Sequence, residues 1–251
     1  SALEAAGQLS RVKAEVDWKY EFAQVVRRTW DFYGDASPAM LFENIKGYKA
    51  PAPNKIFTGS FRSWYRTAMM LGLDPNKTSR SELITTLRDR INNRANFIPP
   101  KIVKTGPVKE NIVTGDKVDM TMFPVPFFGE RDGGRYIGTM HSVITRDPDS
   151  DWMNVGTYRM MMHNGQETGI QMDPANQHIG QHFYKHVENN EPMPVAVVIG
   201  QEPALTFMGA SPTLEPVSEF DVAGAIRGEA IEVVKCETSD LYVPANAEIV
   251  L

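Results

Sequence analysis

Two neighbouring runs, Tyr136-Ile-Gly-Thr-Met-His-Ser-Val-Ile-Thr-Arg146 and Asn154-Val-Gly-Thr-Tyr-Arg-Met-Met-Met-His163, decide the fold of this chain. Both are rich in residues that favour strands, and the turn-prone Asp147-Pro-Asp149 lies between them. A third run, Thr168 to Met172, follows Asn164-Gly165, a dipeptide typical of tight hairpins. Strands joined by short turns pair antiparallel, so these runs predict a meandering sheet or barrel.

The residues on either side extend the β-rich pattern and interrupt it with helices. Apolar periodicity predicts a helix over about Pro174 to Asn190 and a short helix near Ser218 to Ile226. Further strands are predicted at Val118 to Phe128, Val195 to Ile199, Ile231 to Cys236 and Glu248 to Leu251.

The first part of the chain has a different pattern, in which helices and strands are mixed. Phe22, Val25, Val26 and Trp30 recur at helical spacing, which predicts an amphipathic helix over Asp17 to Phe32. Strands are predicted at 39–45 and 56–59, and helices at 60–73 and up to about 91, the last capped by Thr78 or Ser81.

Prolines and weak periodicity between Arg94 and Asp116 mark a connector, and we place a domain boundary near residue 112. The predicted fold class is α+β. An N-terminal α/β unit, residues 1–112, precedes a β-rich unit, residues 113–251.

Composition restricts the possible partners and location. The formal net charge of −5 argues against nucleic acid and anionic membrane surfaces as partners. No run approaches the roughly 20 apolar residues that cross a membrane. The chain has one cysteine, Cys236, which favours a reducing compartment, and we expect a cytoplasmic protein.

Three histidines, His178, His182 and His186, recur at intervals of four and would share one helix face. Taken alone they suggest a metal, but a rise of about 1.5 Å per residue separates the first and third rings by about 12 Å. At most two could share one ion, which counts against the alternative of a zinc hydrolase that uses all three. A surface or capping role is equally compatible with His182 and His186.

Two further segments have both a structural and a functional interpretation. The run from Asn154 to Arg159 joins an amide, a glycine and a guanidinium, a combination that can hold an anion, although an ordinary strand would look the same. Ser218 and Glu219 precede a helical pattern, so capping alone would explain them.

Several of these segments, in this order, resemble the UbiD-like family of decarboxylases that depend on prenylated FMN. The opening residues from Glu4 to Asp17 also look like a family N-terminus, so the resemblance spans nearly the whole chain. The segments that carry it are Gly133-Gly-Arg-Tyr-Ile137, Asn154-Val-Gly-Thr-Tyr-Arg159, Asn176-Gln-His-Ile179, Met193-Pro-Val-Ala-Val-Val-Ile-Gly200, Ser218-Glu219, Ala223-Gly-Ala-Ile-Arg-Gly228, Lys235-Cys-Glu-Thr238 and Pro244-Ala-Asn-Ala-Glu-Ile-Val250.

The resemblance implies a flavin-reductase-like split β-barrel for residues 113–251, incomplete at its C-terminus, and a set of site residues. A divalent metal, Mn²⁺ or Mg²⁺, would be held by Asn154, His178 and Glu219 and would bridge to the cofactor phosphate, with K⁺ as a further ion. Arg159 matches an arginine at the reacting centre. The cofactor-binding residues implied are Asn154, Val155, Gly156, Thr157, Tyr158, Arg159, Gln177, His178 and Glu219.

The implied activity is the reversible, non-oxidative decarboxylation of an aromatic or α,β-unsaturated acid, with the flavin accepting the electrons that CO₂ leaves behind. The family's catalytic acids lie beyond the segment that ends this chain, so we expect a fragment that is inactive by itself. The resemblance also implies a flavin prenyltransferase as cofactor supplier and a homo-oligomer at full length. The alternative is a flavin- and metal-binding subunit without activity of its own.

Overall fold

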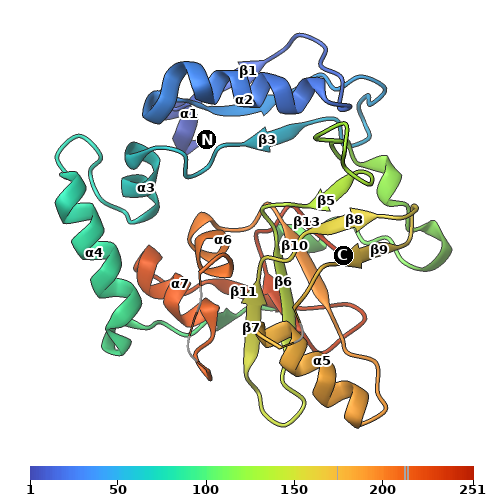
Figure 1. Cartoon of the computed structure of the whole chain (residues 1–251). Helices are drawn as coiled ribbons and strands as arrows, with labels where there is room; N and C mark the ends of the chain where they lie inside the picture. The colour runs from blue at the N-terminus through green and yellow to red at the C-terminus, as the bar shows by residue number, and fades with distance from the viewer. Residues whose placement is uncertain (174, 212, 214) are drawn as a thin grey trace.

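The computed structural model of the chain describes residues 1–173, 175–211, 213 and 215–251, and its fold is α+β (Figure 1). One sheet and one helix form a layer at the N-terminal end, and the remaining sheets lie together in the C-terminal half. Across the described ranges, no helix is both long and apolar enough to span a membrane.

The N-terminal layer is a three-stranded sheet with one amphipathic helix beside it. The middle strand runs parallel to the first strand and antiparallel to the third. Phe22 and Val26 of the helix pack against Met40 and Phe42 of the sheet, which are almost completely buried. The elements are α1 (Ala2–Ala5), β1 (Leu9–Val12), α2 (Glu21–Tyr33), β2 (Ala39–Phe42) and β3 (Ile56–Thr58).

α2 begins four residues later than its periodicity predicts, because the preceding residues bond to a distant segment. The amide of Tyr20 donates to the carbonyl of Phe127 at 2.8 Å, and the amide of Phe127 donates to the carbonyl of Trp18 at 3.0 Å. The predicted strand from Val118 to Phe128 is therefore wrong. It forms a short 3₁₀ helix at Met120–Met122 and a single bridge to Lys19.

Two helices connect this layer to the C-terminal half: α3 (Trp64–Met70) and α4 (Arg80–Asn92). The cap of α4 is Ser79, whose Oγ accepts a hydrogen bond from the amide of Glu82 at 3.1 Å. Thr78 and Ser81, the predicted caps, do not have this role, because an N-cap must lie immediately before the first helical residue. Ala68, Leu71 and Leu83 of this region join the largest hydrophobic core.

The two runs that predict the fold each divide between two sheets. The first run supplies β5 and β6, and the second supplies β7 and β8. β6 and β7 belong to an antiparallel sheet of order β13-β10-β6-β7, whereas β5 and β8 form a second sheet with β9. The bounds are β5 (Tyr136–Gly138), β6 (Ser142–Arg146), β7 (Met153–Gly156), β8 (Met160–Met162), β9 (Thr168–Ile170), β10 (Ala196–Ile199) and β13 (Ile249–Val250).

A fourth sheet, of order β12-β11-β4, completes the β structure of the described residues. The sheets are separate: β1-β2-β3 and β12-β11-β4 are mixed, whereas the other two are antiparallel. The strands in the described part of the chain form no closed barrel. The predicted helix over 174–190 is shorter, and its expected start at Pro174 lies outside the described residues. The remaining elements are β4 (Lys101–Ile102), α5 (His178–Glu188), α6 (Pro203–Gly209), α7 (Glu219–Arg227), β11 (Glu232–Lys235) and β12 (Tyr242–Pro244).

The cores explain where the helices sit. α6 and α7 pack against each other, and their buried faces, with Leu205, Met208 and Phe220 fully covered, fill one side of the four-stranded sheet. α5 lies at the other end of the C-terminal half, next to β6 and β7 (Figure 1). The strand β7 therefore has contacts with the helices α5, α6 and α7.

Candidate functional site

Asn154 lies on β7, opposite Thr145 of β6 in the register, and its side chain is buried with a residue exposure of 2%. Its amide nitrogen donates to the hydroxyl of Tyr158 at 3.3 Å. Its amide oxygen lies 3.3 Å from Nδ1 of His178. Asn154 thus connects the strand to the beginning of α5.

His178 is the first residue of α5, and Gln177 is the residue that precedes the helix. The ring of Trp152 packs edge-on against the ring of His178, with centroids 4.9 Å apart and an interplanar angle of 73°. The imidazole is therefore bounded by an amide on one side and an indole on another.

Glu219 is the first residue of α7 and is also buried, with a residue exposure of 2%. Its Oε2 accepts a hydrogen bond from the amide of Val155 at 2.7 Å, and its Oε1 accepts one from the hydroxyl of Thr213. Burial raises the pKa of the Glu219 carboxyl to about 7, since water is absent to solvate the charged form, although these hydrogen bonds act in the opposite direction. Ser218 caps the helix, as the sequence predicts.

The segment after Asn154 folds tightly around Tyr158. A Cβ on Gly156 would lie 2.3 Å from the Tyr158 hydroxyl, so only glycine allows the ring to take this place. Burial raises the pKa of Tyr158, and the nearby charge of Glu219 also raises it. The amide of Thr157 donates to the carbonyl of Gly209 at 2.8 Å, which ties this segment to the end of α6.

Two predicted site residues point to different partners. Arg159 is exposed, and its Nε donates to the side-chain oxygen of Gln171. The side-chain oxygen of Gln177 accepts from the amide of Asp173 at 2.6 Å. Among the described residues, neither side chain makes a hydrogen bond to the side chain of Asn154, His178 or Glu219.

The three histidines of α5 do not form one metal site. Nδ1 of His182 lies 2.9 Å from the hydroxyl of Thr145, and burial lowers the pKa of His182 to about 4. His186 lines a separate cavity of about 280 Å³ with Asp147 and Asp240. No group of three His, Cys, Asp or Glu side chains within the described ranges could hold a metal ion.

A mixed site that includes an amide oxygen fits a hard divalent ion better. With bonds of about 2.1 Å to an octahedral ion, adjacent ligand atoms lie about 3 Å apart. The 3.3 Å between Asn154 Oδ1 and His178 Nδ1 is close to that spacing. The buried Glu219 carboxylate accepts hydrogen bonds from the amide of Val155, the residue after Asn154, and from the hydroxyl of Thr213. Neither donor among the described residues is a cation. The donor set and the desolvated charge are therefore compatible with Mn²⁺ or Mg²⁺.

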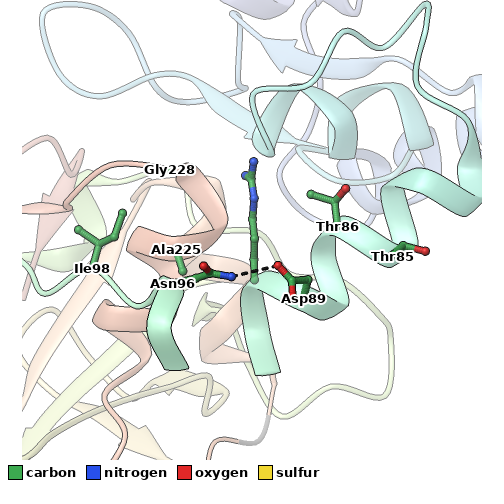
Figure 2. A pocket seen from close by; sticks show the side chains of 8 residues that line it. Thr85, Thr86, Asp89, Asn96, Ile98, Ala225 and Gly228 are labelled. Carbon is green, nitrogen blue, oxygen red and sulfur yellow. Dashed lines mark hydrogen bonds between the residues drawn. The ribbon is translucent and has the colours of Figure 1, made fainter. Parts of the chain in front are cut away.

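A cavity larger than the one beside His186 lies elsewhere. It measures about 530 Å³ and is open to solvent between α4, the following turn and α7 (Figure 2). Three of its polar side chains are paired with other groups: Asn96 donates to Asp89 at 3.0 Å, and Arg90 donates to the carbonyls of Leu71 and Ile226. The bond from Arg90 to Ile226 joins α4 to α7, and the bond from Asn96 to Asp89 joins α4 to the turn that follows it, so this cavity has a structural explanation.

Sequence reasoning missed two residues that shape the site. Trp152 lies two residues before Asn154, a spacing that places alternate side chains of an extended chain on one side. That spacing is a signal that could have identified it. Thr213 carries no such signal, because its approach to Glu219 depends on the fold of the loop before α7.

Comparison with known proteins identifies the family. Residues 101–251 match the profile of the 3-octaprenyl-4-hydroxybenzoate carboxy-lyase Rift-related domain (UbiD), and residues 1–85 match that of the N-terminal domain of the same family. The chain is 36% identical over 259 residues to a phenolic acid decarboxylase of Sedimentibacter hydroxybenzoicus, covering 99% of this chain and 52% of that protein.

Two further relatives agree. A pyrrole-2-carboxylic acid decarboxylase of Pseudomonas aeruginosa is 36% identical, covering 99% of this chain and 50% of that protein. The structure of an evolved dimeric form of the UbiD-class enzyme HmfF from Pelotomaculum thermopropionicum, in complex with prFMN, has a TM-score of 0.85 at 30% identity, covering 99% of this chain and 54% of that one. The chain spans about half the length of these relatives, and it belongs to the UbiD family of carboxy-lyases.

Proposed function

We propose that this chain is the part of a decarboxylase that holds a prenylated FMN and a divalent metal, with Asn154, His178 and Glu219 as metal ligands. The observation that supports this most directly is the meeting of three distant segments at β7. Asn154 Oδ1 lies 3.3 Å from His178 Nδ1, and the Val155 amide donates to Glu219 at 2.7 Å. All three residues are polar, and Asn154 and Glu219 are nearly inaccessible to solvent.

Two helix ends support an anionic ligand at the same place. His178 and Glu219 are the first residues of α5 and α7, and a helix N-terminus presents free amides and a partial positive charge. A phosphate group next to a divalent ion would be stabilised by both helix ends. The bound flavin would supply the electron sink that decarboxylation requires.

The substrate class that we propose is an aromatic or α,β-unsaturated carboxylic acid. The relatives named phenolic acid decarboxylase and pyrrole-2-carboxylic acid decarboxylase support the aromatic class. Arg159, exposed at the end of the Asn154 segment, offers a guanidinium that can pair with a substrate carboxylate. Gln177 and the residues from Val155 to Tyr158 would line the cofactor.

Several finer features belong to the same proposal. Residues 113–251 would form the cofactor unit, related to a split barrel, with the boundary near residue 112. A K⁺ ion, a flavin prenyltransferase as supplier and assembly into homo-oligomers at full length complete the proposal. The location in the cytoplasm and the inactivity of the chain by itself stay predictions.

A metal titration tests the proposed site. The binding of Mn²⁺ to the 251-residue chain is measured from the loss of the free-ion signal in electron paramagnetic resonance. The wild type should bind, and Asn154→Ala and His178→Ala should lose binding. His163→Ala, which removes an exposed histidine on the turn before β9, is the matched control and should bind as the wild type does. Unchanged binding by His178→Ala would contradict the assignment.

The alternative, a binding subunit without activity, differs in one measurement. The chain is loaded with prFMN and Mn²⁺, by itself and as part of the longer protein, and CO₂ release from aromatic and acrylic acids is followed. Release by the longer protein alone supports the decarboxylase. Binding of the flavin without release in either form would favour the subunit.

A further inference from the structure

The three proposed metal ligands lie on three segments of the chain. One side chain that is not a ligand belongs to the segment of Asn154 and contacts the segments of His178 and Glu219. Trp152 lies two residues before Asn154 on the same stretch of chain and is buried, with an exposure of 7%. Its ring packs against His178 at the start of α5. Its indole Nε1 donates to the carbonyl of Val217, two residues before Glu219, at 3.3 Å.

We propose that Trp152 is a positioning residue that aligns His178 and Glu219 with Asn154 for metal binding. This inference rests on the proposed function, because it concerns the same site. Trp152 is not itself a ligand, since an indole nitrogen carries only a donor hydrogen. It acts through the residues that it holds.

The contact with α5 holds the helix at two successive turns. The Trp152 ring lies 4.9 Å from the ring of His178 and 4.9 Å from the ring of His182, both in edge-to-face geometry. Because one indole contacts two imidazoles one turn apart, it restricts the rotation of both rings. Such edge-to-face pairs are a favoured arrangement of aromatic rings.

The second histidine, His182, contacts the sheet that carries Asn154. Nδ1 of His182 lies 2.9 Å from the hydroxyl of Thr145, and Thr145 is the cross-strand partner of Asn154. The contacts from Trp152 to His182 and from His182 to Thr145 therefore start and finish beside Asn154. This arrangement explains two buried polar groups, His182 and Thr145, that the ligand set does not use.

The contact with α7 depends on the indole nitrogen. Val217 precedes the helix cap Ser218, and the hydrogen bond from Trp152 to its carbonyl holds the backbone where the helix begins. Phenylalanine in place of Trp152 would keep an aromatic edge near His178 and lose this bond. Leucine would lose both contacts, so the two substitutions separate the two effects.

The test measures Mn²⁺ affinity and the state of the His178 ring in the 251-residue chain. The variants are Trp152→Phe, Trp152→Leu and His178→Ala. Val234→Ala, which truncates a fully buried side chain of β11 in the main core, controls for a general loss of stability. Nuclear magnetic resonance of the metal-free chain reports the ring-current shift at His178 and the contact between its ring and the Asn154 side chain.

We expect Val234→Ala to bind Mn²⁺ as the wild type does, Trp152→Phe to bind more weakly, and Trp152→Leu to bind about 10- to 100-fold more weakly, the usual cost of removing a group that orients a ligand. The His178–Asn154 contact should be lost in Trp152→Leu. Wild-type affinity and an intact contact in Trp152→Leu would overturn the positioning role and leave the metal site standing. A wild type that binds no Mn²⁺ would overturn the site and the role together.

Discussion

Replacing Glu219 by glutamine should stabilise the metal-free chain at neutral and alkaline pH and should lose this advantage in acid. In the folded chain the Glu219 pKa is about 7, against an ordinary value of 4.5, because burial penalises the charged form. Each pH unit between these values corresponds to about 1.4 kcal/mol, so ionisation of the buried carboxyl costs the fold about 3 kcal/mol.

The sign follows from which state holds the proton. Between pH 4.5 and about 7 the folded chain keeps the Glu219 proton and the unfolded chain releases it, so the free energy of unfolding falls as the pH rises through this window. Glutamine does not titrate and keeps an oxygen that can accept from the Val155 amide. The stability of Glu219→Gln relative to the wild type should therefore rise by about 3 kcal/mol between about pH 4 and pH 8.

Urea unfolding with a chelator present, followed by circular dichroism at each pH, measures this difference. Glu130→Gln, at an exposed glutamate, controls for the removal of one negative charge. Added Mn²⁺ should stabilise the wild type at about pH 8 and leave Glu219→Gln nearly unaffected, since the ion would neutralise the buried carboxylate. A stability difference that stays constant with pH would refute the reasoning about burial, whatever the metal does.

Three further predictions concern buried groups. Burial lowers the pKa of His141 and of His182 to about 4. As the pH falls from 6.5 to 4, these histidines are protonated in the unfolded chain before the folded one, so the free energy of unfolding should fall by up to about 3 kcal/mol for each. Urea unfolding of the wild type and of His182→Gln measures this loss. Lys185→Met leaves the buried Asp147, 2.8 Å from the lysine in the wild type, without its cation and should cost about 1 to 2 kcal/mol in the same assay. Gly156→Ala places a methyl group 2.3 Å from the Tyr158 hydroxyl and should lower the melting temperature, with a cost of about 1 to 3 kcal/mol; an unchanged melting temperature would contradict the packing argument.

Local pattern was sufficient for most of the helices. α2 and α4 follow their apolar periodicity, and α7 begins at the residue after Ser218, its predicted cap. The helix α6 was missed because it is a short apolar run that fills the core, and periodicity cannot distinguish such a run from a buried strand. The predicted start of α2 was wrong because the backbone hydrogen bond from Tyr20 to Phe127 joins residues that are far apart in the sequence.

The strands show the limit of local pattern more clearly. Residues 136–146 form one continuous β-rich run, yet its two halves belong to different sheets. Strand propensity reports how well a side chain suits a half-buried pleated surface, and it does not report which partner strand is available. Pairing is decided by packing between distant segments, such as β6 with β10 and β7.

The candidate site divides in the same way. Residue type and the resemblance to the family indicated Asn154, His178 and Glu219, while spacing on the helix argued against a single site made of three histidines. In the structure, His182 lies next to Thr145 and His186 lines a separate cavity. The contacts of Trp152 with His178 and Val217, and the contact of Thr213 with Glu219, come from the tertiary structure, although the spacing of Trp152 from Asn154 is a signal in the sequence. Arg159 and Gln177 stay predictions, since their present partners are Gln171 and Asp173.

By itself the sequence determined the kinds of chemical groups present, the α+β class and the beginning of the helix that carries Glu219, because these depend on residues close together along the chain. Only the tertiary structure decided that the helices carrying His178 and Glu219 both start against β7, and that burial there raises the pKa of Glu219. The physical reason is that desolvation and convergence are properties of neighbours in space, which packing selects after the local elements have formed.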